Sequence, residues 1–181
     1  MRALRDRIGP DVRVLFVGIN PGLRSAATGH HFAGYSNRFW KLLFEAGLVP
    51  EPITYEDDDR LPEWGYGITN IVARATAGID ELTPADYRAG ARLLPRKIRR
   101  FKPAVVALVG VTVWRAVLEA LGEPEARTCP VQLGMQPRLL EGARVCVLPN
   151  PSGRNATLRY EDMVAAFAKL RADLPSAKRE A

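Results

Sequence analysis

The strongest constraint on the fold is a set of short aliphatic runs that alternate with segments of helical periodicity. The clearest run, residues 104–110 (AVVALVG), is apolar throughout and rich in valine. A strand without alternating polar residues is typical of a sheet that is covered on both faces. Similar runs occupy residues 12–18, 67–73 and 144–148. The sequence therefore predicts an α/β domain with three α/β/α layers, built on a mostly parallel sheet of four to five strands.

Helices are predicted between these strands. Ser36 or Asn37 can cap the first of them, because both side chains carry an acceptor for free backbone N–H groups. Residues 83–86 (TPAD) combine a hydroxyl cap, an early proline and an acid, which is typical of a helix start. Pro95 is expected to kink or break that second helix. The four helices are expected at residues 36–47, 83–101, about 112–121, and from 160 onward.

The length of 181 residues fits a single domain, expected over residues 1–175 and followed by a flexible tail at 176–181. Residues 19–36 are expected to form a long loop, and the proline-containing acidic stretch 51–63 a surface connection. No apolar run approaches the roughly 20 residues of a membrane span, and the charged N-terminal stretch does not resemble a secretory signal. These features favour a cytoplasmic monomer that makes no contact with a membrane.

The formal net charge of +6 suits a polyanionic partner, although many basic proteins bind no nucleic acid. The densest basic stretch, residues 92–102, is more typical of a solvated helix face than of a binding site. Cys129 and Cys146 form no CxxC pair, and the adjacent His30 and His31 lack a clustered third ligand. No metal site and no cofactor are predicted.

Two loops follow strand ends, where parallel sheets usually bind their ligands. The first, residues 18–40 (GINPGLRSAATGHHFAGYSNRFW), leaves the strand that ends at Gly18. Gly18 and Gly22 permit close approach of a ligand to the backbone, and Pro21 stiffens the corner from which Asn20 projects. Asn20 offers both a donor and an acceptor. A plain tight turn is the alternative interpretation of the same five residues.

The motifs GINPGL, SAATG, FAG and NRFWKLL occur in this order between residues 18 and 43. Together with GITNIV at residues 67–72, AVVALVG at 104–110 and VLPNPSG at 147–153, they resemble the mismatch-specific uracil-DNA and thymine-DNA glycosylase family of the uracil-DNA glycosylase superfamily. The resemblance covers residues 12–170, and its specificity comes from the order and spacing of the whole set.

The resemblance implies that Asn20 is the catalytic residue that holds the hydrolytic water, and that Phe32 stacks on a flipped base. Extruded bases are usually held against aromatic faces, but Phe32 could also be a core residue. Asn70 stands where some bacterial members carry lysine; it could bind the edge of uracil, or it could be a polar residue at a strand end that faces water. The predicted substrate-binding set is Gly18, Ile19, Gly22, Ser25, Phe32 and Asn70.

The second loop, residues 149–156, leaves the last predicted strand and could by composition be an ordinary turn. The resemblance implies that it enters the duplex as a wedge and contacts phosphate, since an extruded base leaves a gap to fill. Arg154 departs from the aliphatic wedge of bacterial members, but its planar guanidinium can also stack. The predicted wedge and phosphate residues are Asn150, Ser152, Gly153, Arg154 and Asn155.

These inferences predict a monofunctional DNA glycosylase that flips a damaged or mismatched base, such as uracil, ethenocytosine or thymine opposite guanine, out of double-stranded DNA. No lysine stands in a motif that suggests Schiff-base chemistry. Two alternatives remain open: a non-catalytic sensor of damaged bases, and an unrelated nucleotide-binding α/β protein. Against the nucleotide-binding alternative, the sequence contains neither the GxGxxG nor the GxxxxGK[ST] motif.

Overall fold

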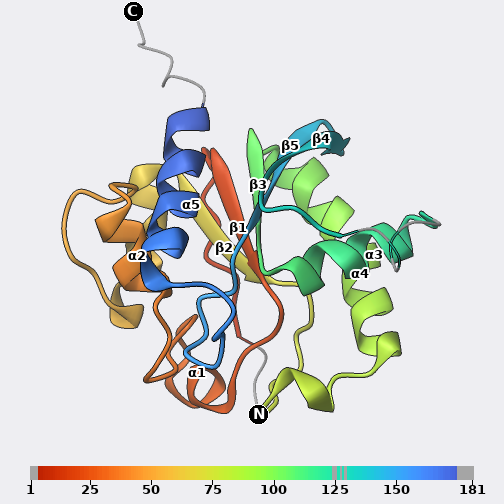
Figure 1. Cartoon of the computed structure of the whole chain (residues 1–181), viewed down its shortest axis with the longest axis horizontal. Coiled ribbons are helices and arrows are strands. Elements are labelled where there is room, and N and C mark those ends of the chain that lie inside the picture. Colours follow the sequence, from red (N-terminus) through yellow and green to blue (C-terminus); the bar gives the residue numbers. More distant parts are fainter. Residues whose placement is uncertain (1–3, 124–125, 127, 129, 175–181) are drawn as a thin grey trace, which may run out of the picture.

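The computed structural model describes residues 4–123, 126, 128 and 130–174. The predicted tail at 176–181 lies outside this range. A five-stranded sheet in the order β2-β1-β3-β5-β4 forms the middle layer, with helices on both of its faces (Figure 1). The predicted α/β/α architecture is confirmed.

Four strands of the sheet are parallel, and the fifth is an antiparallel edge strand. The register pairs Phe16 with Ile68 on one side and with Ala107 on the other. The three inner strands are almost completely buried, which explains why their sequences lack alternation. The strands are β1 (Val14–Gly18), β2 (Tyr66–Asn70), β3 (Val105–Val109), β4 (Gly134–Leu140) and β5 (Ala143–Leu148).

Each face of the sheet has its own apolar core. One core packs α2 and α5 around Phe16, Phe39 and Phe167, and the other packs α3 and α4 around Leu15, Leu94 and Val113. The helices are α1 (Leu23–Thr28), α2 (Phe39–Glu45), α3 (Pro84–Phe101), α4 (Val111–Ala120) and α5 (Tyr160–Asp173), with 3₁₀ helices η1 (Tyr55–Trp64) and η2 (Ile79–Glu81).

The predicted start of α3 is confirmed, because Thr83 and Asp86 form a reciprocal capping box there. The predicted cap of α2 is corrected: its N-cap is Arg38, although Asn37 Oδ1 still accepts a hydrogen bond from the N–H of Phe39, the first helical residue, at 2.9 Å. The predicted break at Pro95 is wrong, because α3 continues through it. Proline has no backbone N–H and therefore removes one hydrogen bond of the helix. Leu94 and Ile98, on either side of it, are buried in the core, and this packing stabilises the helix despite the lost hydrogen bond.

Two predictions about loops are also corrected. Residues 19–36 are not a continuous loop, since they contain α1. The acidic stretch 51–63 is not simply a surface connection: most of it is η1, and Asp58 within it is fully buried. The apolar runs of the sequence predict no strand at the position of β4, which forms an edge of the sheet. It includes Pro137, the ladder shifts register between Met135 and Leu139, and its exposed positions weaken the apolar pattern.

Candidate active site

A cleft of about 880 Å³ opens at the carboxyl ends of the parallel strands. It is bounded by the two loops that the sequence singled out and by residues 76–80, which follow β2. The predicted site residues that line it are Ile19, Asn20, Gly22, Ser25, Phe32, Asn70, Asn150, Ser152, Arg154 and Asn155. Gly18 and Gly153 do not line the cleft; each of them leaves room for a side chain that packs closely against its backbone.

The side chain of Asn20 has a defined orientation. Its Nδ2 atom donates to Thr76 Oγ1 at 2.7 Å, to the carbonyl oxygen of Arg74 at 3.0 Å and to that of Pro21 at 3.2 Å. Thr76 is buried and donates its own proton to the carbonyl oxygen of Gly78 at 2.7 Å, so its oxygen is the acceptor for Asn20. Within the described residues Oδ1 has no hydrogen-bond partner, and this oxygen is the acceptor that Asn20 can offer to the cleft.

Phe32 forms an aromatic wall of the cleft and does not belong to the fully buried core. One face of its ring stacks on Phe39, with the centroids 4.2 Å apart and the planes inclined by 23°. Its φ angle of 50° lies in the left-handed region, which is costly for a residue with a side chain. The conformation persists because Phe39 and the backbone contacts of the neighbouring His31 hold the segment.

Gly18 provides the space in which Phe32 and Asn70 meet. A Cβ atom at Gly18 would lie 2.5 Å from Asn70 Oδ1 and 3.1 Å from Phe32 Cζ. Gly22, in contrast, has nothing within 4 Å of such an atom and serves as the backbone N-cap of α1. The space beside Gly18 is therefore taken by protein side chains, whereas Gly22 lines the cleft with open space beside it. Close approach of a ligand to these two glycines stays a prediction.

Asn70 is oriented by the buried imidazole of His31. The Nε2 atom of His31 lies 2.9 Å from the carbonyl oxygen of Arg5, so it carries the proton and leaves Nδ1 as an acceptor. Asn70 Nδ2 lies 3.4 Å from that Nδ1 atom. Burial lowers the pKa of His31 below its usual 6.5, which favours this neutral form. The geometry turns the amide nitrogen of Asn70 toward His31 and its oxygen toward Gly18.

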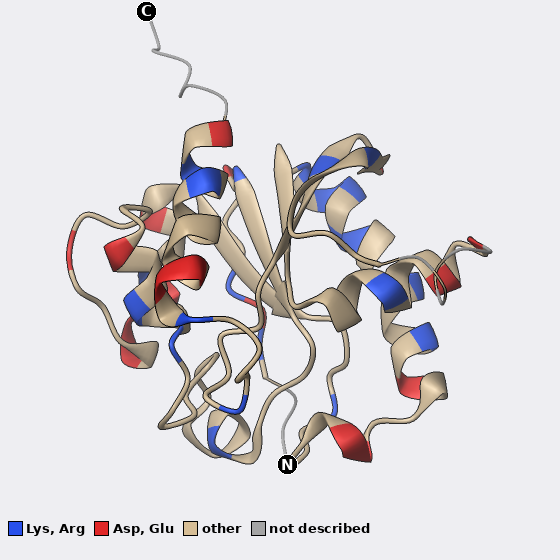
Figure 2. Ribbon diagram, viewed as in Figure 1, with Lys and Arg blue, Asp and Glu red and all other residues tan. Residues whose placement is uncertain are grey.

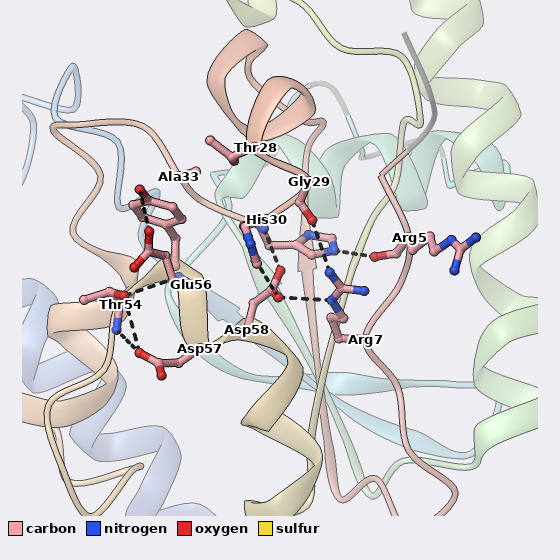
Figure 3. A network of polar contacts seen from close by, with 12 residues as sticks. Arg5, Arg7, Thr28, Gly29, His30, Ala33, Thr54, Glu56, Asp57 and Asp58 are labelled. Atoms are coloured by element: carbon pink, nitrogen blue, oxygen red, sulfur yellow. Dashed lines mark hydrogen bonds and ion pairs between the residues drawn. The ribbon is translucent and has the colours of Figure 1, made fainter.

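The segment that carries Phe32 is anchored by the buried carboxylate of Asp58, which binds the two residues before Phe32. Figure 3 shows Asp58 between Arg7 and His30. Its Oδ1 atom lies 3.1 Å from Arg7 Nε and 3.0 Å from His30 Nδ1, and Oδ2 accepts from the backbone N–H of His31 at 2.9 Å. The two histidines thus belong to a hydrogen-bond network, and the described residues contain no group of potential metal ligands.

Ser25 contributes to the shape of the same segment. Its buried hydroxyl accepts a hydrogen bond from the N–H of Ala33 at 3.0 Å. Ser25 therefore has a structural role, because its oxygen already has a backbone partner, and its substrate-binding role stays a prediction.

The second loop is shaped by its own asparagines. Asn150 Oδ1 accepts from the N–H of Ser152 at 3.0 Å, and Asn155 Nδ2 donates to the carbonyl oxygen of Asn150 at 2.9 Å. These side chains shape the loop, whereas the guanidinium of Arg154 is exposed and has no hydrogen bond to any described residue.

Arg38, at the start of α2, fastens the second loop to the first. Its Nη2 atom donates to the carbonyl oxygens of Ser152 at 2.8 Å and Asn155 at 3.3 Å, and its backbone N–H donates to Pro151. Gly153 lies so close to Ser36 that a Cβ atom would be 2.4 Å from the serine Cβ. Sequence reasoning missed Arg38, Thr76 and Asp58 because each acts through a partner distant in the chain.

Positive charge is not concentrated at the cleft. Lysine and arginine are spread over helices on both sides of the sheet as well as over the loops (Figure 2). In the basic stretch of α3, Lys97 pairs with Asp6 at 2.7 Å and Arg99 pairs with Glu141 at 2.8 Å. This distribution fits the predicted solvated helix face.

The sequence also matches a known protein family. The profile of the Uracil DNA glycosylase superfamily matches residues 6–174, which is most of the sequence. The chain belongs to the uracil DNA glycosylase superfamily. Members of this superfamily act on DNA as N-glycosylases, so DNA binding and hydrolase chemistry are the activities this membership implies.

The fold is also similar to that of a solved structure. The solution NMR structure of a candidate uracil DNA glycosylase from Methanosarcina acetivorans matches with a TM-score of 0.59 at 17% sequence identity. The match covers 94% of this chain and 98% of the other. In the part of the chain that the structure describes, no helix has the length and apolar character that crossing a membrane requires.

Proposed function

We propose that this protein is a monofunctional DNA glycosylase that hydrolyses the N-glycosidic bond of uracil, or of a related damaged base, in a mismatch with guanine. Membership of the superfamily supports the reaction class, and the sequence motifs support the mismatch-specific uracil and thymine type. The proposed substrate is double-stranded DNA, bound by a monomer with neither metal nor cofactor.

The observation that carries the proposal is the fixed amide of Asn20. Cleavage of a base–sugar bond passes through an oxocarbenium-like sugar, and such an electrophile requires a well-placed water more than a strong base. The three acceptors around Nδ2 direct the donors of Asn20 away from the reaction, which leaves Oδ1 to accept a hydrogen bond from that water. An amide cannot take up the proton, so we expect slow chemistry that favours good leaving groups.

The opposite side of the cleft supplies the groups that would hold the base. Phe32 offers an aromatic face, and Asn70 lies close to the ring of Phe32, with its side-chain oxygen free of hydrogen bonds to the described residues. An amide oxygen in this position can accept the N3–H of uracil or thymine, whereas the unprotonated N3 of cytosine has no proton to donate. Backbone amides of the first loop, such as that of Ile19, are candidates for stabilising charge on the departing base.

Single-turnover cleavage of labelled duplexes tests the proposal. The duplexes carry U·G, U·A, T·G or ethenocytosine·G, with single-stranded uracil in parallel, and abasic sites are revealed by alkali. We expect cleavage at U·G that Asn20→Ala abolishes while binding to the damaged duplex persists. Absence of cleavage with every substrate and excess protein would contradict the proposal; retained lesion binding would then indicate a sensor.

A further inference from the structure

Tyr35 is a prominent aromatic side chain at the rim of the cleft. It is 90% exposed, the highest value among the exposed large hydrophobic residues that the structure describes. It occupies a tight turn in which the N–H of Asn37 donates to the carbonyl oxygen of Gly34 at 3.0 Å. Gly34 and Ser36, on either side of it, both line the cleft. The turn therefore projects an aromatic ring outward beside the opening.

This turn is held against the second loop. The neighbouring Ser36 contacts Gly153, and Arg38 binds carbonyl oxygens of the second loop through both its backbone and its side chain. Tyr35 thus occupies a fixed position next to the loop that we expect to enter the duplex.

The ring of Tyr35 is supported on one face by Arg24. The Cζ atom of Arg24 lies 3.8 Å from the ring centroid, a close cation–π contact. Arg24 is itself fixed, since Nε donates to the carbonyl oxygen of Ala33 at 2.7 Å and Nη2 donates to Tyr55 Oη at 3.1 Å. One face of the ring therefore rests on an anchored guanidinium, and the high exposure leaves the other face open to solvent.

We propose that Tyr35, backed by Arg24, is a stacking platform for a nucleobase that flanks the damaged nucleotide. The inference rests on the proposed function, because it assumes that DNA bound at the cleft contacts the turn that carries Tyr35. Every nucleobase has a π face, so stacking on a tyrosine needs no particular sequence. A ring that is already held in place loses little conformational freedom on binding, and the charge of Arg24 adds attraction for the nearby phosphates.

The test uses a duplex with an uncleavable 2′-fluoro-uridine opposite guanine. The fluorescent base 2-aminopurine is placed, one position at a time, next to the lesion on either strand. Wild type is compared with Tyr35→Ala and with Tyr35→Phe, which keeps the ring but lacks the hydroxyl. Leu139→Ala is the matched control, since Leu139 is exposed on the edge strand β4 outside the cleft lining.

We expect wild type and Tyr35→Phe to change the 2-aminopurine signal at one flanking position and to bind alike. Tyr35→Ala should lose that change and bind about five- to hundredfold more weakly, as expected when one stacked base is lost. Leu139→Ala should behave as wild type. The proposal is overturned if Tyr35→Ala matches wild type in affinity and in signal at every flanking position.

Cleavage of a U·G duplex by the same proteins separates this inference from the proposed function. If no protein cleaves any duplex but Tyr35→Ala still loses binding and signal, the proposed glycosylase function is wrong and the proposed stacking role of Tyr35 is supported. If all proteins cleave and Tyr35→Ala binds as wild type does, the platform alone is wrong.

Discussion

The guanidinium of Arg154 lies against the backbone of Gly78, on the opposite wall of the cleft. A Cβ atom at Gly78 would be 3.3 Å from Arg154 Nη1. The second loop therefore reaches across the mouth of the cleft to the segment after β2. The guanidinium of Arg154 has no hydrogen-bond or ion-pair partner among the described residues, so little opposes its movement when DNA binds.

Arg154→Ala should slow excision from duplexes. Extruding a base costs a few kcal/mol, and a wedge that fills the gap offsets part of this cost. We expect the single-turnover rate on U·G duplexes to fall about ten- to hundredfold, with a much smaller change on single-stranded uracil, where no gap forms. Arg159→Ala is the control, because Arg159 is equally charged, exposed and outside the cleft lining. Equal losses on both substrates would show that Arg154 does not act as a wedge.

Thr76→Val should impair catalysis through Asn20. The variant removes the hydroxyl that accepts from Asn20 Nδ2 and donates to the carbonyl oxygen of Gly78. Loss of a buried hydrogen-bond partner costs about 1–3 kcal/mol, and we expect a tenfold or larger fall in the single-turnover rate at saturating protein. Thr76→Ser keeps the hydroxyl and should retain most activity. If the valine variant is folded and fully active, Thr76 does not position Asn20.

The sequence predicted the sheet and its cleft better than the contacts that support the site. The strands β1 and β3 can be recognised in the sequence because strands covered on both faces are continuously apolar. The carboxyl ends of parallel strands then locate Asn20, Asn70 and the second loop on one edge of the sheet. The roles assigned to these residues remain predictions, although the fold brings them to one cleft.

The supporting contacts could not be read from local sequence because they join distant segments. Asp58 stands in an acidic run that is typical of a surface, yet it is buried between Arg7 and His30. Thr76 has no motif that marks it as a partner of Asn20, 56 positions earlier. Only the tertiary structure places such pairs together.

Gly18→Ala should damage the base pocket. The added methyl group would meet Asn70 Oδ1 at 2.5 Å and Phe32 Cζ at 3.1 Å, so the two side chains must move apart. We expect a loss of about 1–3 kcal/mol in the free energy of unfolding, as for other overpacked sites, and a weaker affinity for the uracil duplex. Gly22→Ala, with nothing within 4 Å of the new atom, is the matched control for unfolding. Equal behaviour of both variants in thermal unfolding would contradict the geometry at Gly18.

The stability of the protein should decrease in mild acid because of His31. Burial lowers the pKa of its imidazole in the folded state, whereas the unfolded chain has the usual value of 6.5. Below about pH 6.5 the unfolded state therefore binds more protons at this site than the folded state does. The free energy of unfolding should fall as the pH is lowered from 6.5 toward the folded pKa, and the site should contribute no pH dependence above about 7.5.

Urea unfolding between pH 5 and 8 measures this dependence. His31→Gln removes the titrating group and should flatten the slope in that window, while His30→Gln, beside it in the network of Asp58, leaves the buried imidazole in place. The carboxylates of Asp6 and Asp58 and the guanidinium of Arg7 also act on His31, so the comparison between the two variants isolates the contribution of the ring. If both variants keep the wild-type slope, burial of His31 does not govern stability in this range.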